Sequence, residues 1–286
     1  MASFPSPRVL DSERLVGLRR CVLAASVLDA IDVLAGDDGV VLEGLTPLLV
    51  PWQEIDEAVG AADPDTDQGR RRLRTWLHLR SRLAELDALP RRLRAVGLPV
   101  GHALHPGRRW IRHEVHGGAI DVGLGVLGAL DDPDEVIVIP PSMLAAKGID
   151  PAACWPELAY QLEQTCRLAA KRLTKDPKGP LRPFGDFDVV TLLASSAFRA
   201  ELCATDPVGW RTAAVPMRQR GWLDLGRIDP AFAAAAALAT EPEERGFDRA
   251  ILVTPEEVVV APAGGQAAAH ALLDPPASLD SWQRRT

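Results

Sequence analysis

The chain has 286 residues, of which 47% are hydrophobic and 25% are charged, and its formal net charge is -7 at pH 7. This length and composition provide enough apolar surface for one large domain or two ordinary ones. The negative net charge argues against a protein whose whole surface binds nucleic acid, although it is compatible with a local basic face.

The sequence predicts neither a secretory signal nor a membrane-spanning helix. The first residues, MASFPSPRVLDSERL, place acids where a signal peptide needs an apolar stretch. The segments CVLAASVLDAIDVLAG and AFAAAAALA are too charged or too short to cross a bilayer, which takes about 20 apolar residues. The four cysteines contain no C-x-x-C pair and are expected to be reduced and mostly buried. We therefore expect a cytoplasmic protein without membrane contact.

The amino-terminal elements are predicted from periodicity and from Gly and Pro positions. Apolar residues recur at helical spacing over residues 11–35, and Gly36 stands where a left-handed cap would end that helix. Short strands are expected at residues 40–44 and 48–50, followed by an amphipathic helix at residues 52–59.

A polar stretch, AADPDTDQG at residues 61–69, is the best linker candidate in this part of the chain. It suggests a division into an amino-terminal part, residues 1–62, and a main domain, residues 63–286. A single domain is the alternative.

A second long helix is predicted from residue 69 to residue 94, with a break at Pro90 and a stop at Gly97. Residues 110–127 and 135–140 have strand-like patterns. Gly117 and Gly118 are expected to form the turn of a hairpin within the first of these stretches.

The carboxy-terminal half mixes predicted helices and strands without regular alternation. Helices are expected at 141–148, 151–176, 187–204 and 230–240. The last third is also expected to contain an irregular segment with tryptophans, a hairpin at 250–262 and a short final helix. The fold class predicted for the whole chain is α+β, with mixed helices, short and mainly antiparallel strands, and a helical amino-terminal part.

Glycines in RHEVHGGAIDVGLGVLG fit the pattern G-x-G-x-x-G at Gly123, Gly125 and Gly128. A dinucleotide-binding loop needs a strand before this pattern and a crossover helix after it. Only ALDDPDE separates Gly128 from the next apolar strand, which is too short for such a helix. We therefore interpret these glycines as positions in a β-ribbon and predict no cofactor.

Four histidines within 15 residues, namely His102, His105, His113 and His116, suggest a metal site as an alternative function. His113 and His116 are three residues apart in a predicted strand, where an odd spacing places side chains on opposite faces. A bulge, or a turn beginning at His116, could still bring His113 to His102 or His105, with Glu114 or Asp121 completing the shell. The alternative hypothesis is therefore a metal-dependent enzyme that uses this histidine cluster.

Other residue types that often carry chemistry have simpler explanations. Asp186 and Asp188 form a D-x-D pair, but Asp186 is expected to cap the following helix with Asp188 in its first turn. Ser195 and Ser196 lack the G-x-S-x-G context of a nucleophile, and nothing marks Cys166 as activated.

Arginines dominate the helix predicted at residues 69–94. Because leucines and a tryptophan occupy one side of this helix, the arginines are expected to form a positive face in an acidic protein. The alternative explanation is that these arginines are ordinary solvated residues paired with acids of the same chain. The residues predicted to contact an anionic partner are Arg70, Arg71, Arg72, Arg74 and Arg80.

The stretches GGAIDVGLGVLG, RPFGDFDVVTLL, VPMRQRGWLDLGRIDPAF and RGFDRAILVTPEEVVVAP resemble an uncharacterised group of actinobacterial proteins with no assigned activity. The resemblance covers residues 110–262. It implies a cytoplasmic protein of a high-GC bacterium and transfers no catalytic or binding residue.

The main functional prediction is a protein that acts by binding an anionic partner, which could be a protein, a nucleotide or a nucleic acid. A weaker hypothesis is a small-ligand or nucleotide pocket at the loop of residues 175–186, where Lys175, Lys178 and Arg182 could meet phosphate. The sequence leaves the oligomeric state, and whether the protein is an enzyme, open.

Overall fold

The computed structural model describes residues 10–44, 47–59, 63–86, 89–129, 136–175, 179–223 and 230–261. The chain divides into two compact units, Met1–Leu93 with Val126–Cys154, and Arg94–Gly125 with Trp155–Thr286. Helices and mainly antiparallel strands occur in both, which confirms the α+β class. Within the described ranges, no helix combines the length and the apolar character needed to cross a membrane.

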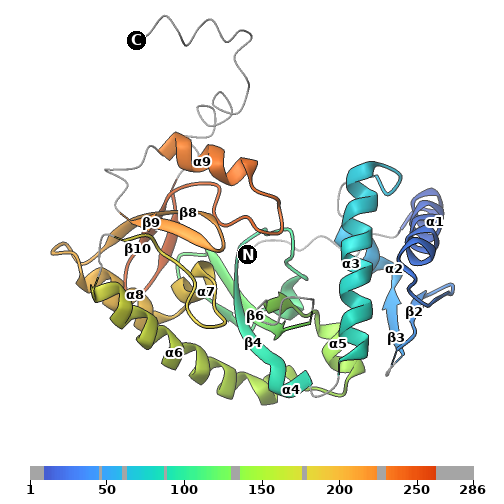
Figure 1. The fold of residues 1–286 in the computed structure, drawn as a ribbon, viewed down its shortest axis with the longest axis horizontal. Helices are drawn as coiled ribbons and strands as arrows, with labels where there is room; N and C mark the ends of the chain where they lie inside the picture. The colour runs from blue at the N-terminus through green and yellow to red at the C-terminus, as the bar shows by residue number, and fades with distance from the viewer. Residues whose placement is uncertain are drawn as a thin grey trace, which may run out of the picture. The chain divides into compact units, whose positions relative to one another are not determined.

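The first unit packs helices around a small antiparallel sheet with the strand order β1-β2-β3. Figure 1 shows α1 and α3 side by side, and α3 also packs against α2. The elements of this unit are α1 (Ser12–Asp29), β1 (Val33–Ala35), β2 (Gly39–Leu42), β3 (Leu48–Pro51), α2 (Trp52–Val59), α3 (Asp67–Glu85), α4 (Leu89–Arg92), β7 (Val136–Val138) and α5 (Pro141–Ala146). The boundary expected near residue 62 therefore falls inside this unit, because α3 packs on the helices that precede it.

Helix α1 is shorter than predicted. The Asp11 side chain caps its first turn by accepting a hydrogen bond of 2.7 Å from the Arg14 backbone N–H. The helix ends at Asp29 because Ala30 adopts a left-handed conformation, with φ of 52°. The prediction of a helix up to residue 35 is wrong, since residues 33–35 pair with β2 instead.

The second unit contains two sheets, with the strand orders β4-β6-β5 and β11-β10-β8-β9. Its buried core joins both sheets to α6, α7 and α8 (Figure 1). The elements are β4 (Leu93–Pro99), the 3-10 helix η1 (Arg108–Trp110), β5 (His113–Glu114), β6 (Ile120–Leu127), α6 (Pro151–Lys175), α7 (Val189–Ala194), α8 (Ser196–Ala204), β8 (Arg211–Met217), β9 (Arg220–Leu223), α9 (Pro230–Ala239), β10 (Ile251–Val253) and β11 (Val258–Val260). The first residues of β4 and α6 and the last two of β6 belong to the first unit.

Two hairpins of the second unit confirm their predictions. Gly117 and Gly118 have φ of 94° and 66°, as a tight turn between antiparallel strands requires, and they connect β5 to β6. Strands β10 and β11 pair within the hairpin predicted at residues 250–262.

Three predicted elements of this unit need correction. Residues 93–99 form strand β4 rather than a continuation of the helix. Glycine suits position 97 of this strand because a Cβ there would lie 3.0 Å from the Thr191 Cα. The segment expected to be irregular forms β8 and β9. The helix predicted at residues 187–204 is two helices that meet at Ser195. The final helix falls outside the described residues.

Candidate functional site

The predicted contact arginines lie on α3, which begins at Asp67. This start places Arg70, Arg71, Arg72 and Arg74 in the first two turns. Positions 70 and 71 precede position 74 by four and three residues, so both lie beside it on one exposed side of the helix. Positive charge near the amino end of a helix is electrostatically unfavourable, because the helix dipole is positive there.

Two of these three exposed arginines carry surface ion pairs. Arg70 Nη2 lies 2.8 Å from Asp67 Oδ1, and Arg74 Nε lies 3.0 Å from Asp29 Oδ2. The hydrogen bonds from these arginines hold the pKa of both carboxyl groups below their usual range, so both acids are ionised near neutral pH. The alternative explanation of the arginines as paired, solvated residues therefore accounts for part of this face.

Arg80 does not belong to the predicted contact surface. Its side chain is only 7% exposed, its Nη2 lies 3.1 Å from Glu54 Oε1, and its guanidinium stacks over the Trp76 ring. Burial lowers the pKa of Arg80 to about 10, although Glu54 counteracts this shift. Arg80 is a buried structural cation and cannot contact a partner directly.

Arg72 is half-buried and donates a hydrogen bond of 3.3 Å to the Val59 carbonyl. Arg71 is exposed, and the structure shows no hydrogen bond or ion pair from it to any described residue. The part of the predicted set that faces solvent is thus Arg70, Arg71 and Arg74, which we call the arginine patch.

His102 and His105 are both held by hydrogen bonds at each ring nitrogen. Nδ1 of His102 accepts from the Leu104 N–H at 3.1 Å, so its Nε2 donates to the Arg245 carbonyl at 2.9 Å. Nδ1 of His105 likewise accepts from the Gly107 N–H at 3.1 Å, and its Nε2 lies 3.1 Å from Asp121 Oδ2. Neither ring has a nitrogen left for a metal ion.

His113 and His116 are exposed, whereas His102 and His105 are half-buried. The His113 backbone pairs with Val122, whereas the His116 carbonyl accepts a hydrogen bond of 2.9 Å from the Val258 N–H. The described part of the chain contains no group of three or more His, Cys, Asp or Glu side chains suited to a metal ion. Among the described residues, the fold brings His105 to Asp121 but does not gather the four histidines into one group, so this geometry gives the metal-site hypothesis no support.

The buried position of the His102 ring leads us to expect that the folded protein loses stability as the pH falls below neutral. Burial, and secondarily the charge of Arg218, lower the pKa of His102 to about 4 from its ordinary 6.5. The unfolded chain therefore binds a proton more readily than the folded one between these two pH values. Lowering the pH through this window should reduce the free energy of unfolding by up to about 3 kcal/mol, measured by urea denaturation. A decline of equal size in His102→Gln, which cannot be protonated there, would contradict this origin.

The glycine pattern lies in a strand, as predicted. Gly123 and Gly125 are part of β6, and Gly128 follows in a turn with φ of 63°. A Cβ at Gly123 would lie 2.2 Å from the Trp110 ring, so this glycine makes room for a buried tryptophan. Packing against Trp110 therefore accounts for Gly123, and the turn accounts for Gly128.

The two acids of the D-x-D pair are engaged by arginines. Asp188, and not Asp186, caps α7 by accepting a hydrogen bond of 2.7 Å from the Thr191 N–H. Asp188 Oδ2 also lies 2.7 Å from Arg218 Nε, and Asp186 Oδ2 lies 2.6 Å from Arg94 Nε. An aspartate caps this helix as predicted, but it is Asp188 rather than Asp186.

The Ser195 hydroxyl donates to Glu163 Oε2 at 2.7 Å and accepts from the Phe198 N–H at 3.2 Å, which makes it the cap of α8. Burial raises the pKa of the Cys166 thiol to about 12. All four cysteines are free thiols, and three are buried, as predicted. These groups stabilise the fold and show no activation for nucleophilic catalysis.

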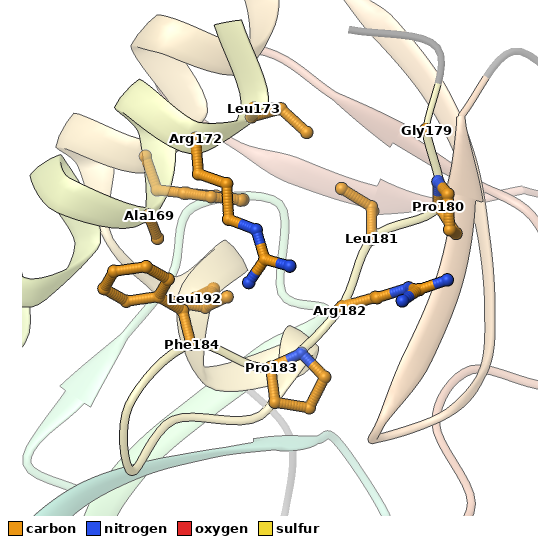
Figure 2. Close-up of a pocket in the computed structure, with 11 residues that line it drawn as sticks. Ala169, Arg172, Leu173, Gly179, Pro180, Leu181, Arg182, Pro183, Phe184 and Leu192 are labelled. Carbon is orange, nitrogen blue, oxygen red and sulfur yellow. The ribbon is translucent and has the colours of Figure 1, made fainter. Parts of the chain in front are cut away.

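The loop of residues 175–186 does border a pocket, which Figure 2 shows in close-up. Arg182 lines this pocket, as the weaker hypothesis expected, but Lys175 is an exposed residue that does not line it, and Lys178 lies outside the described residues. The second cation of the pocket is Arg172 on α6, which the sequence analysis did not identify. Its position three residues after the buried Ala169 is a helical-face signal that could have indicated it.

The chain matches no protein-family model, and comparisons with curated proteins and with solved structures give no match either.

Proposed function

We propose that this protein acts by binding an anionic partner through the arginine patch of α3. Three exposed arginines on one helix face, at the end where the helix dipole disfavours them, carry the proposal. Residues that are unfavourable for local stability are typical of functional positions. Arginine suits this role because its planar guanidinium binds carboxylate and phosphate with two parallel hydrogen bonds.

The ion pairs of the patch do not prevent partner binding. The side chains of Arg70 and Arg74 remain 53% and 52% exposed. Exposed ion pairs contribute at most about 1 kcal/mol, so a partner's anionic group can replace or extend them. Arg71 makes no such pair with any residue that the structure describes and is expected to be the first contact.

Removal of two of the three exposed charges should weaken binding of polyanions. The double variant Arg70→Gln and Arg71→Gln leaves the buried face of α3 intact. Three probes represent the three partner classes: a DNA duplex of about 20 base pairs, ATP and poly-L-glutamate. We expect one of them to bind with a Kd of about 1–100 µM at physiological salt, and the variant to bind it at least about tenfold more weakly.

The matched control removes two exposed cations from α6, in Arg167→Gln and Lys171→Gln, so that the net charge changes equally. This control should bind within about twofold of the original protein. The proposal fails if none of the three probes binds, or if the control variant weakens binding as much as the α3 variant does.

A further inference from the structure

A second binding site is suggested by the pocket between the carboxy-terminal half of α6 and residues 179–184 (Figure 2). Its volume is about 220 Å³. The apolar lining includes Leu181, Leu192 and Phe198, which are each at most 3% exposed, and the half-buried Phe184. The pocket therefore offers an apolar floor that continues into the core of the second unit.

The described side chains that line this pocket carry positive charge and no acidic group. Arg172 and Arg182 both line it and are exposed, and neither makes a hydrogen bond or ion pair with a described residue. Figure 2 shows the Arg172 side chain extending from α6 toward the labelled apolar residues, whereas the Arg182 side chain extends away from Arg172. An anionic group in the pocket would meet Arg172 first.

The walls of the pocket are fixed by backbone hydrogen bonds. Leu181 and Gly221 exchange two of them, of 2.8 and 3.1 Å, and Phe184 and Phe187 exchange two more, of 3.0 and 3.2 Å. Pro180 and Pro183 further restrict the segment between these anchor points. A site formed in advance binds its ligand without the entropic cost of ordering a loop.

The volume limits the ligand to a small molecule. A cavity of about 150 Å³ holds one benzene ring, and pockets for drug-sized ligands are about 300–1,000 Å³. The present pocket lies between these values, so it accommodates one ring with an attached polar group but not a whole nucleotide. Two phenylalanines in the lining favour an aromatic body over an aliphatic chain.

We propose that this pocket binds a small aromatic anion, an aryl carboxylate or aryl phosphate, with its ring on the apolar floor and its charged group on Arg172. Arg182 adds positive potential at the pocket. All of the residues given for this pocket belong to the second unit, whereas the arginine patch belongs to the first.

The test measures which part of the ligand is needed, by isothermal titration calorimetry and ligand-observed NMR. Phenyl phosphate and benzoate carry both a ring and an anionic group, inorganic phosphate and acetate carry only the anion, and benzyl alcohol carries only the ring. We expect phenyl phosphate or benzoate to bind with a Kd below about 1 mM, and the three partial probes to bind at least about tenfold more weakly. If phenyl phosphate binds more tightly than benzoate, the ligand is an aryl phosphate, and the reverse order indicates an aryl carboxylate.

Two variants and a control assign the site. Arg172→Gln should weaken binding of the better probe at least about tenfold, and Arg182→Gln by a smaller factor of about two to five. Arg167→Gln removes an exposed arginine of α6 that does not line the pocket, and it should bind within about twofold of the original protein. All three positions are exposed, so melting temperatures within about 2 °C of the original are expected to confirm intact folding.

The proposal is overturned if neither aromatic anion binds saturably at concentrations up to about 10 mM. It is also overturned if inorganic phosphate or acetate binds as tightly as its aromatic counterpart, because the apolar floor would then have no role. If Arg172→Gln and the control Arg167→Gln bind the better probe with equal Kd, the ligand does not contact Arg172 and this assignment of the site is also overturned.

Discussion

Replacing Glu54 with alanine is expected to lower the free energy of unfolding by about 3–5 kcal/mol, measured by urea denaturation. The substitution leaves the Arg80 guanidinium buried without its counterion, 3.1 Å from where the carboxylate stood. A buried charge without a partner is far more costly than an exposed one, because the desolvation penalty is no longer offset.

A double variant and a surface control identify the cause of this loss. Glu54→Leu combined with Arg80→Met replaces the buried pair by apolar side chains of similar size and should recover most of the stability. Asp67→Ala removes a carboxylate from the exposed pair with Arg70 and should cost no more than about 1 kcal/mol. Equal losses for Glu54→Ala and Asp67→Ala would show that Arg80 is not the buried structural cation described above.

Replacing Gly123 with alanine is expected to lower the free energy of unfolding by about 3 kcal/mol, at the upper end for an overpacked core. The added methyl group would lie 2.2 Å from the Trp110 ring. This ring is 1% exposed, and its Nε1 donates a hydrogen bond of 2.8 Å to the Leu124 carbonyl, so it has little room to move.

The control for this glycine is Gly36→Ala, whose added Cβ would have its nearest neighbour at 3.7 Å. We expect this change to alter stability by less than about 1 kcal/mol, measured in the same denaturation experiment. In addition, Gly123→Ala should cost much less in a Trp110→Leu background, because the clashing ring is absent. A cost that is unchanged in that background would contradict the packing explanation of the glycine pattern.

Local signals in the sequence were sufficient where neighbouring residues determine the structure. The Gly117-Gly118 turn was predictable because positive φ at two successive positions favours glycine, and the structure confirms it. Strand β4 was not predictable in this way. Its pairing and the close approach of Gly97 to Thr191 depend on residues far away in the chain, whereas Gly97 and Pro99 by themselves resemble a helix stop.

The same distinction applies to the candidate sites. Composition indicated an arginine-rich helix, but it could not show that Arg74 pairs with Asp29, which is 45 residues away. Arg80 carried a usable signal, because it follows Leu77 by three residues and Leu73 by seven on the buried stripe of the helix. The helical face of Arg172 could be inferred from its spacing to Ala169, but the pocket forms only because residues 179–184 fold back against α6, which no local pattern reveals.

The most direct test of the proposed function is the salt dependence of binding to the probe that the protein prefers. For a DNA duplex, each arginine that contacts a phosphate contributes about 0.9 to the slope of log Kobs against log salt concentration. We predict that the variant lacking Arg70 and Arg71 has a slope smaller by about 1–2, whereas the matched α6 variant keeps the original slope. An unchanged slope in the α3 variant would contradict partner binding through the arginine patch.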